Sequence, residues 1–286
     1  MEIAVTTGFS HRTPVEFIVG AAERIEAAGF AALWVPEHVL MFPEYASRYP
    51  YSEDGKVPGN PDGVLDPFTA LTFIAAHTST LRLGTGICLV PQRQPVYTAK
   101  MVADLDYLSG GRVDFGIGVG WLEEEFISLG LDFSARGSTC TEYVDAMKAL
   151  WGPDPVNFSG DTIAIKNANF NPKPVQSPHP PIFVGGESTP ALRRVARFAD
   201  GWYGFGLSPE ELGEHLVRLD EHLEAAGRSR AEIKVCVCPN RIRVQPGMAD
   251  AYAEAGADQL IVPIGGRNLE AMNKHIDSAI AATEMS

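Results

Sequence analysis

Residues 81–119 read LRLGTGICLVPQRQPVYTAKMVADLDYLSGGRVDFGIGV and hold the clearest signal of the architecture. Two short apolar runs, Leu81–Cys88 and Val113–Val119, have the length and composition of buried strands. Between them, Pro95–Leu108 repeats its apolar residues at helical spacing, begins with proline and ends at Ser109-Gly110-Gly111. The stretch therefore predicts one strand–helix–strand unit of a parallel sheet.

The same alternation continues on both sides of this unit. Further strands are expected at Ile3–Thr7, Ala32–Pro36, Pro181–Val184, Gly201–Gly204, Ile233–Cys238 and Gln259–Pro263, and helices at Val15–Ala28, Pro67–His77, Ser134–Trp151, Pro190–Ala199, Pro209–Ala226, Met248–Ala255 and Leu269–Ala282. Eight such units in 286 residues predict an α/β fold of the (β/α)8 TIM barrel type, and an open doubly wound sheet is the alternative. No stretch has the composition of an interdomain linker, so we predict one domain over residues 1–286.

Two long segments interrupt the alternation. Val39–Gly63 is a Pro-, Tyr- and Gly-rich insertion after the second strand, and Val156–His179 lies between the fourth helix and the fifth strand. The second segment contains a hairpin signal at Ser159-Gly160-Asp161. Long loops in a compact domain are usually functional or disordered. We expect both segments on the rim formed by the carboxyl-terminal ends of the strands.

Composition and charge exclude several classes of partner. The net charge is −13 and the pI is near 5.0, so nucleic acid and anionic membranes would be repelled. No run approaches the ~20 apolar residues of a membrane span, and Met1–Val5 begins as a strand rather than as a signal peptide. We expect the four cysteines to be reduced, which indicates a cytoplasmic protein.

In a TIM barrel the active site lies at the carboxyl-terminal ends of the strands, so residues just after each apolar run are the candidates. Glu37 and His38 follow the second strand. His38 could donate a proton or a hydrogen bond to a bound ring, although a lone histidine is more often structural. After the fourth strand, Glu123–Glu125 could supply an acid to the barrel mouth or be a solvated first helical turn.

Glycines at two strand ends indicate where a ligand could approach the backbone. After the fourth strand these are Gly116, Gly118 and Gly120, followed by Trp121, and after the fifth strand Gly185 and Gly186, followed by Glu187, Ser188 and Thr189. The first group matches a dinucleotide fingerprint only loosely. The second group opens a helix whose free N–H groups suit a phosphate, but a plain N-cap explains the same residues without a ligand.

Motifs of other enzyme classes are missing from the sequence. It has no Gly-x-Ser-x-Gly elbow and no P-loop, and its histidines show no metal-ligand spacing, so we predict no metal site. A lyase or aldolase barrel would need a Schiff-base lysine or a metal cluster at a strand end. Lys100, Lys148 and Lys274 instead fall on expected helices.

Several segments along nearly the whole chain occur together, in this order, in one enzyme superfamily. They are GFAALWVPEH (29–38), LRLGTGI (81–87), PQRQP (91–95), LSGGR (108–112), GIGVGW (116–121), PKPVQ (172–176), PIFVGG (181–186) and ADGW (199–202). With them the chain resembles the luciferase-like monooxygenase superfamily, and within it the subgroup that uses the deazaflavin coenzyme F420.

The resemblance implies a bacterial-luciferase-like barrel with a flavin or deazaflavin ring at its mouth. It assigns ring contacts to Glu37 and His38, an acidic residue near the ring to Glu124, a non-proline cis bond to Gly86–Ile87, further cofactor contacts to Gly118, Gly120 and Trp121, and the phosphate loop to Gly185, Gly186, Glu187 and Ser188. Many relatives carry a long insertion near the seventh strand, where this chain has only Pro239–Gly247. That difference leaves the size of the substrate open.

The expected function is hydride transfer to or from a small organic substrate by coenzyme F420, with His38 as acid or base and Glu124 assisting. One alternative is an FMN-dependent monooxygenase that uses oxygen and reduced flavin. Another is a flavin-binding protein without catalysis. A flavin or F420 reductase as partner and a homodimer are further expectations of the resemblance.

Coenzyme F420 carries a phosphate and an oligoglutamate tail, so it is more anionic than FMN. The net charge of −13 should oppose its approach unless a local basic patch offsets it. Candidate basic residues are His11, Arg12, Arg48, Lys56 and Arg93. We expect some of these to line a groove that leads away from the phosphate loop.

Overall fold

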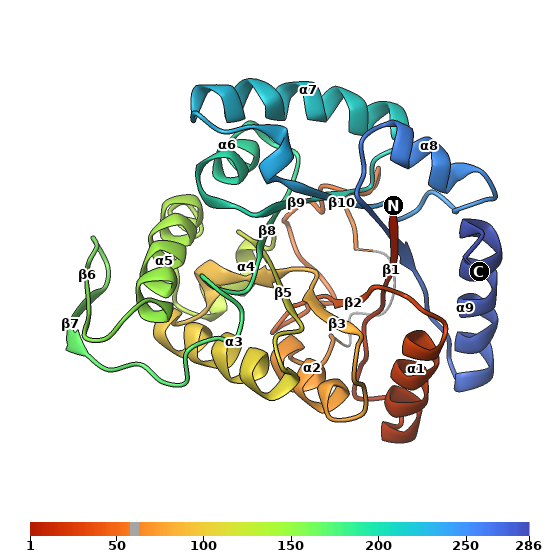
Figure 1. Ribbon diagram of the computed structural model, residues 1–286, viewed down its shortest axis with the longest axis horizontal. Coiled ribbons are helices and arrows are strands. Elements are labelled where there is room, and N and C mark those ends of the chain that lie inside the picture. The colour runs from red at the N-terminus through yellow and green to blue at the C-terminus, as the bar shows by residue number, and fades with distance from the viewer. Residues whose placement is uncertain (58–62, 286) are drawn as a thin grey trace.

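A computed structural model describes residues 1–57 and 63–285, and its strands close into a barrel (Figure 1). The barrel strands are β1 (Glu2–Thr6), β2 (Ala32–Val35), β3 (Arg82–Thr85), β5 (Val113–Gly118), β8 (Ile182–Gly185), β9 (Gly201–Phe205), β10 (Lys234–Cys238) and β11 (Gln259–Pro263). Each pairs in parallel with its neighbours, β1 with β11, and β3 with β5, which completes the ring. The TIM-barrel prediction is confirmed, and the open sheet is excluded.

Helices cover the outside of the barrel, except for one short helix (residues 123–128) that lies at its mouth, as Figure 1 shows. They are α1 (Val15–Ala27), α2 (Pro67–Ala75), α3 (Pro95–Ser109), α4 (Glu123–Ser128), α5 (Arg136–Trp151), α6 (Thr189–Phe198), α7 (Pro209–Ala225), α8 (Met248–Glu254) and α9 (Leu269–Thr283). Their ends follow local chemistry, since Asp66 caps α2 by accepting from Thr69 N at 2.9 Å, and α3 ends at Gly110 with φ of 69°. None of the described helices combines the length and apolarity needed to cross a bilayer.

The expected third strand is divided in two. β3 ends at Thr85, and a two-residue strand β4 (Cys88–Leu89) pairs with β5 farther along. The peptide bond Gly86–Ile87 between them is cis, as the sequence predicts. Ile87 therefore stands on a bulge at the carboxyl-terminal mouth of the barrel.

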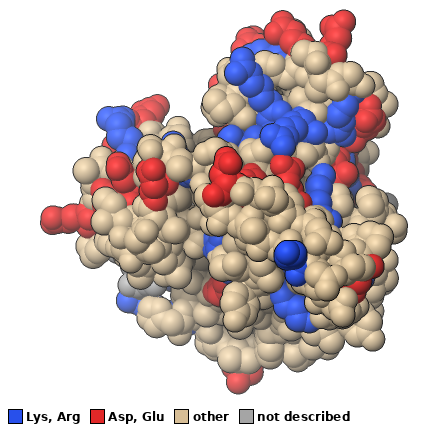
Figure 2. Space-filling model, turned by 90° about the vertical axis from the view of Figure 1, so that its left-hand side faces the viewer, with Lys and Arg blue, Asp and Glu red and all other residues tan. Residues whose placement is uncertain are grey.

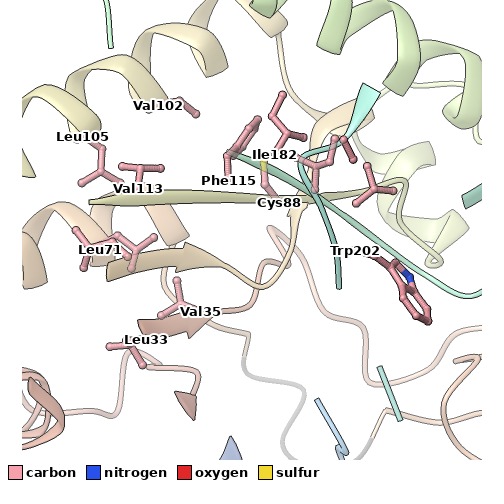
Figure 3. Close-up of a cluster of buried hydrophobic side chains, with 14 of the residues drawn as sticks. Leu33, Val35, Leu71, Cys88, Val102, Leu105, Val113, Phe115, Ile182 and Trp202 are labelled. Carbon is pink, nitrogen blue, oxygen red and sulfur yellow. The ribbon is translucent and has the colours of Figure 1, made fainter. Parts of the chain in front are cut away.

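Alternation along the strands separates two cores. In β2, Ala32 and Trp34 point into the barrel, whereas Leu33 and Val35 pack outward against the helices. Figure 3 shows Leu33 and Val35 in this outer layer. Inside, the Trp34 ring lies so close to Gly116 that a Cβ there would be 3.0 Å from it and 2.0 Å from the Thr85 carbonyl oxygen. The glycine is needed because the barrel interior is filled.

The second long segment lies at the opposite end of the barrel from the one expected. Its predicted hairpin is present as β6 (Val156–Ser159) and β7 (Ala164–Ala168). Farther on, Gln176 donates to the Val113 carbonyl at 2.8 Å and accepts from Arg82 at 3.2 Å. Both partners begin their strands, so this segment crosses the amino-terminal end and the predicted rim position was wrong. The reason is topological: α5 runs antiparallel to the strands and delivers the chain to that end.

Candidate active site

A cavity of about 1600 Å³ opens at the carboxyl-terminal ends of the strands. The residues that follow β1, β2, β5, β8, β9 and β10 line it. The insertion after β2 covers one side through residues 47–53 and 57, while its residues 58–62 lie outside the described part of the chain. Ligand pockets usually measure about 300–1,000 Å³, so this cavity has room for a cofactor and a substrate together.

Two glycines leave space for the bulge residue on the cavity floor. A Cβ at Gly118 would stand 2.2 Å from Ile87 Cδ1, and one at Gly185 would stand 2.7 Å from the same atom. Ile87 thus lies between β5 and β8 as an apolar surface facing the mouth. Gly120 has φ of 82°, and a Cβ there would be 2.9 Å from the Phe126 ring. The predicted cofactor glycines are brought together by these contacts.

His38 is held at both ring nitrogens. Its Nδ1 lies 3.1 Å from Glu125 Oε2, and its Nε2 lies 3.2 Å from Trp121 Nε1. An indole N–H can only donate, so Nε2 is the acceptor, and the network assigns the ring proton to Nδ1. His38 is thereby a neutral base whose Nδ1–H is oriented by a carboxylate. The His38 side chain is 19% exposed and that of Glu125 is 0% exposed.

The acid beside His38 is Glu125, whereas the sequence prediction names Glu124. Glu125 also accepts from Leu40 N and Gln92 Nε2, each at 2.9 Å. Burial acts to raise the pKa of its carboxyl, but His38 and these donors lower the pKa on balance. Glu124 does not line the cavity; it accepts from Ser47 Oγ at 2.7 Å and thus ties down the insertion.

Glu37 lines the cavity, but its carboxylate is committed to the bulge. It accepts from Leu89 N at 2.6 Å and forms an ion pair with Arg93, which also pairs with Asp66. The geometry makes Glu37 a residue that fixes β4 and the helix cap of α2. Its predicted contact with a bound ring stays a prediction.

The loop after β8 presents backbone and cations at the start of α6. Ser188 caps α6, because its Oγ accepts a long hydrogen bond of 3.4 Å from Ala191 N. Trp202 Nε1 donates to the Gly186 carbonyl at 2.9 Å. Arg136 and Arg194 line the cavity beside this helix end. Two cations and free N–H groups at one helix end favour an anion there.

Arg136 carries an unsatisfied donor in this cavity. Its Nε is buried without a hydrogen-bond partner, and its guanidinium lies 3.7 Å from the centre of the Phe133 ring. Burial first, and then the like charge of Arg194, lower the pKa of Arg136. No hydrogen bond or ion pair involves Arg194 within the described residues. These arginines lie where an anionic group would relieve both effects.

The basic residues expected around the groove are mostly elsewhere. Of the five candidates, only Arg48 lines the cavity. Arg93 is ion-paired, and Lys56 lies over the Tyr45 ring at 4.1 Å. Figure 2 shows Lys and Arg gathered over α6 and α7 in the upper part of one flank, with acidic residues among them. Among the arginines that line the cavity, Arg136 and Arg194 come from helices and Arg48 and Arg241 from loops, so the five candidates were only partly right.

Aromatic rings form a continuous row across the insertion side of the cavity. Trp121 meets Tyr49 edge-on at 5.2 Å, Tyr49 meets Tyr51 at 5.4 Å, and Tyr51 meets Phe205 at 4.8 Å. Such edge-to-face pairs are favourable at these separations. The row gives a flat ligand an apolar wall in the same cavity as Ile87.

A profile of the luciferase-like monooxygenase family matches residues 1–284. The chain belongs to this family. An uncharacterized protein of Mycobacterium tuberculosis, Rv0953c, is 30% identical over 265 residues, which cover 91% of this chain and 92% of that protein. Both family membership and the barrel predicted from the sequence are thus confirmed.

Solved structures with a similar fold include an enzyme that uses coenzyme F420 and one that is bound to FMN. The coenzyme F420-dependent tetrahydromethanopterin reductase from Methanopyrus kandleri has a TM-score of 0.73 and 17% identity, with 99% of this chain and 97% of that chain covered. The oxygenating constituent of 3,6-diketocamphane monooxygenase from Pseudomonas putida, in complex with FMN, has a TM-score of 0.64 and 18% identity, covering 82% and 66%.

Among Glu123–Glu125, the resemblance led to the choice of Glu124, although the sequence carries a signal for Glu125. Leu122, Glu125 and Phe126 stand at helical spacing i, i+3 and i+4, so they share one face of α4. That face is buried. A glutamate between two core positions is the one expected to enter the protein, whereas Glu124 points off that face.

Proposed function

We propose that the chain is an oxidoreductase that uses a phosphate-bearing flavin or deazaflavin, with coenzyme F420 as its natural cofactor. The observation that carries the proposal is the cavity geometry. An apolar platform at Ile87, an oriented histidine, the start of α6 and two arginines line one cavity. This arrangement suits a flat ring joined to an anionic tail.

The residues present fit such a group. Gly118 and Gly185 leave room for Ile87 as a surface for a ring, and the row from Trp121 to Phe205 lines the same cavity. The buried, unpartnered Nε of Arg136 supplies a donor for a phosphate. The cofactor supplies hydride chemistry when bound, and the protein supplies its orientation and the proton.

His38 is the group proposed to move that proton. Its Nε2 lone pair accepts a proton once Trp121 turns away, and Glu125 stabilises the imidazolium that results. In the reverse direction the same nitrogen returns the proton to substrate. A non-catalytic flavin-binding protein would have no use for a base oriented in this way.

The share of each solved structure that this chain spans supports the choice of F420 over FMN. The chain spans 97% of the F420-dependent reductase but 66% of the FMN-bound monooxygenase. It thus has the compact form of the former and lacks segments that the latter carries. An FMN-dependent monooxygenase is the second candidate, because relatives of that kind share the same barrel.

Titration of the purified protein with each cofactor tests the proposal. We expect coenzyme F420 to bind more tightly than FMN at low ionic strength. The difference in affinity between the two cofactors should decrease with added salt, because salt screens the arginines. Short secondary alcohols and ketones are then tried with F420, and ketones and sulfones with reduced FMN and oxygen. Tighter binding of FMN at every salt concentration transfers the proposal to the monooxygenase.

Arg194→Glu should lower the affinity for F420 by about tenfold or more, equivalent to about 1.4 kcal/mol. The reason is that a carboxylate would replace a cation of α6 that lines the cavity. Arg193→Glu is the matched control, since it changes the charge equally at an exposed neighbouring position. Equal losses in the two variants would show that only net charge matters and would remove Arg194 from the site. Fluorescence titration measures both.

Gly118→Ala should weaken the binding of either cofactor by about tenfold or more. The added methyl group would stand 2.2 Å from Ile87 Cδ1 and force Ile87 into the space of the ring. Gly213→Ala in α7 is the control because a Cβ there meets nothing within 4 Å. If Gly118→Ala binds FMN and F420 with unchanged affinity, Ile87 is not the platform.

A further inference from the structure

Glu187 joins the loop at the start of α6 to the insertion over the cavity. Its Oε1 accepts from Phe205 N at 2.8 Å, and its Oε2 accepts from the Tyr51 hydroxyl at 3.0 Å. No ion pair involves Glu187 within residues 1–57 and 63–285. Burial raises the pKa of this carboxyl to about 7, although the hydrogen bonds that it accepts act to lower the pKa.

Both protonation states of Glu187 fit this geometry. The ionised carboxylate accepts from both partners as it stands. A protonated carboxyl can instead donate to the Tyr51 oxygen, because a phenol both donates and accepts. A proton can therefore be added without moving any heavy atom.

We infer that Glu187 takes up a proton when a phosphate-bearing ligand binds at the amino-terminal end of α6. The inference rests on the phosphate site of the proposed function. Glu187 immediately precedes Ser188, the N-cap of α6, and lines the same cavity as Gly186. A phosphate brings a charge of about −1.5 to −2. A like charge nearby disfavours the ionised carboxylate, so binding moves the equilibrium toward the acid.

Other titratable and charged groups line this end of the cavity. They are Tyr49 and Tyr51 in the insertion, Tyr203 in β9, Cys238 at the end of β10 and Arg241 after it, Arg194 in α6, and Glu211 and His215 in α7. Burial raises the pKa of both Tyr49 and Cys238 to about 12, and it raises those of Tyr51 and Tyr203 well above the usual value. These four groups are neutral at pH 7–8.

The remaining groups do not change charge in that range either. Burial, followed by the charge of Arg218, lowers the pKa of His215, so its ring is neutral. Hydrogen bonds from Ser208 lower the pKa of Glu211, which stays ionised. The two arginines remain cations. At this end of the described cavity, Glu187 is thus the group whose charge changes just above neutral pH.

Calorimetry with FMN as the probe tests the inference. Binding is measured at about pH 8 in two buffers of different ionisation enthalpy, for the natural protein and for Glu187→Gln. The FMN phosphate is fully ionised there, because its second pKa is about 6. We expect uptake of up to one proton by the natural protein. We expect none by Glu187→Gln, and none when riboflavin replaces FMN.

The affinity for FMN gives a second measurement. In the natural protein it should fall by up to about tenfold per pH unit above pH 7.5. In Glu187→Gln it should be flat, since the amide imitates the protonated acid. Comparing the two cancels any contribution from His38. Tyr51→Phe removes one donor to the carboxylate and should shift proton uptake to higher pH.

The outcomes separate this inference from the proposed function. FMN binding with equal proton uptake in the natural protein and Glu187→Gln, or with no uptake in either, overturns the role of Glu187 alone. Failure of FMN, F420 and inorganic phosphate to bind overturns the phosphate site and the inference with it. Should Glu187→Gln prove unfolded by circular dichroism, Tyr51→Phe decides: an unshifted uptake curve overturns the inference.

Discussion

His38→Ala should lower kcat by about 10²–10⁴, the usual contribution of a general acid or base. The imidazole is a cavity base whose tautomer is fixed by its neighbours, with Nδ1 on Glu125 and Nε2 on Trp121. Cofactor affinity should change little, because Ile87 and the α6 end remain. The test is steady-state turnover of the cofactor with a substrate found among the alcohols, ketones and sulfones named above.

Trp121→Phe is the control for this result. It keeps an aromatic ring in the row but removes the donor to Nε2, so kcat should fall by less than about tenfold. His38→Ala should also cost about 1–3 kcal/mol of stability, because the buried Glu125 loses a partner. The protein should still fold, since domains have about 5–15 kcal/mol available. Normal turnover by His38→Ala would leave His38 with a structural role only.

The barrel could be predicted because its evidence is local. Each strand is an apolar run, each helix begins with a cap or a proline, and the order alternates along the chain. The position of residues 156–179 could not be read from composition, which says that a loop is long but not where it lies. The direction of α5 fixes that position. An excursion after a helix belongs at the amino-terminal end, and one after a strand at the active-site end.

Residues of the site could be predicted from the sequence only where they lie at the ends of strands. His38 and Gly185 lie directly after buried strands, and the structure places both on the cavity. Arg136 and Arg194 come from helices, whose rotation about the axis decides which residues face inward. Sequence spacing alone places many arginines near a rim. Arg136 and Arg230 both have a buried, unpartnered Nε, but of the two only Arg136 lines the cavity, and only the packing reveals this.

Glu124 and Glu125 are neighbours in the chain but have different partners and different roles. They are adjacent, equally charged and in the same short helix. The helical turn sends Glu125 inward to His38 and Glu124 outward to Ser47. This pair allows an experiment in which the control differs from the test by a single position.

Glu125→Gln should lower kcat by about tenfold to a hundredfold, about 1.4–2.7 kcal/mol in transition-state energy. The amide oxygen can still accept from His38 Nδ1–H, so the ring stays oriented. What is lost is the negative charge that stabilises the imidazolium. With that charge removed, proton transfer at His38 is less favourable, so the loss should fall on kcat rather than on KM. A purely structural role for Glu125 would lower the stability of the protein and leave kcat unchanged.

Glu124→Gln makes the same change of charge one residue earlier, at a carboxylate that binds Ser47 rather than His38. It weakens the hold on Ser47, so its effect should fall on KM and on the rate at which the insertion is cleaved by protease. We therefore expect kcat within about threefold of the natural protein, as for surface changes away from the reacting groups. An equal loss of kcat in both variants would assign the effect to the field of α4 as a whole. A loss of kcat in Glu125→Gln alone identifies Glu125 as the residue that positions the catalytic histidine.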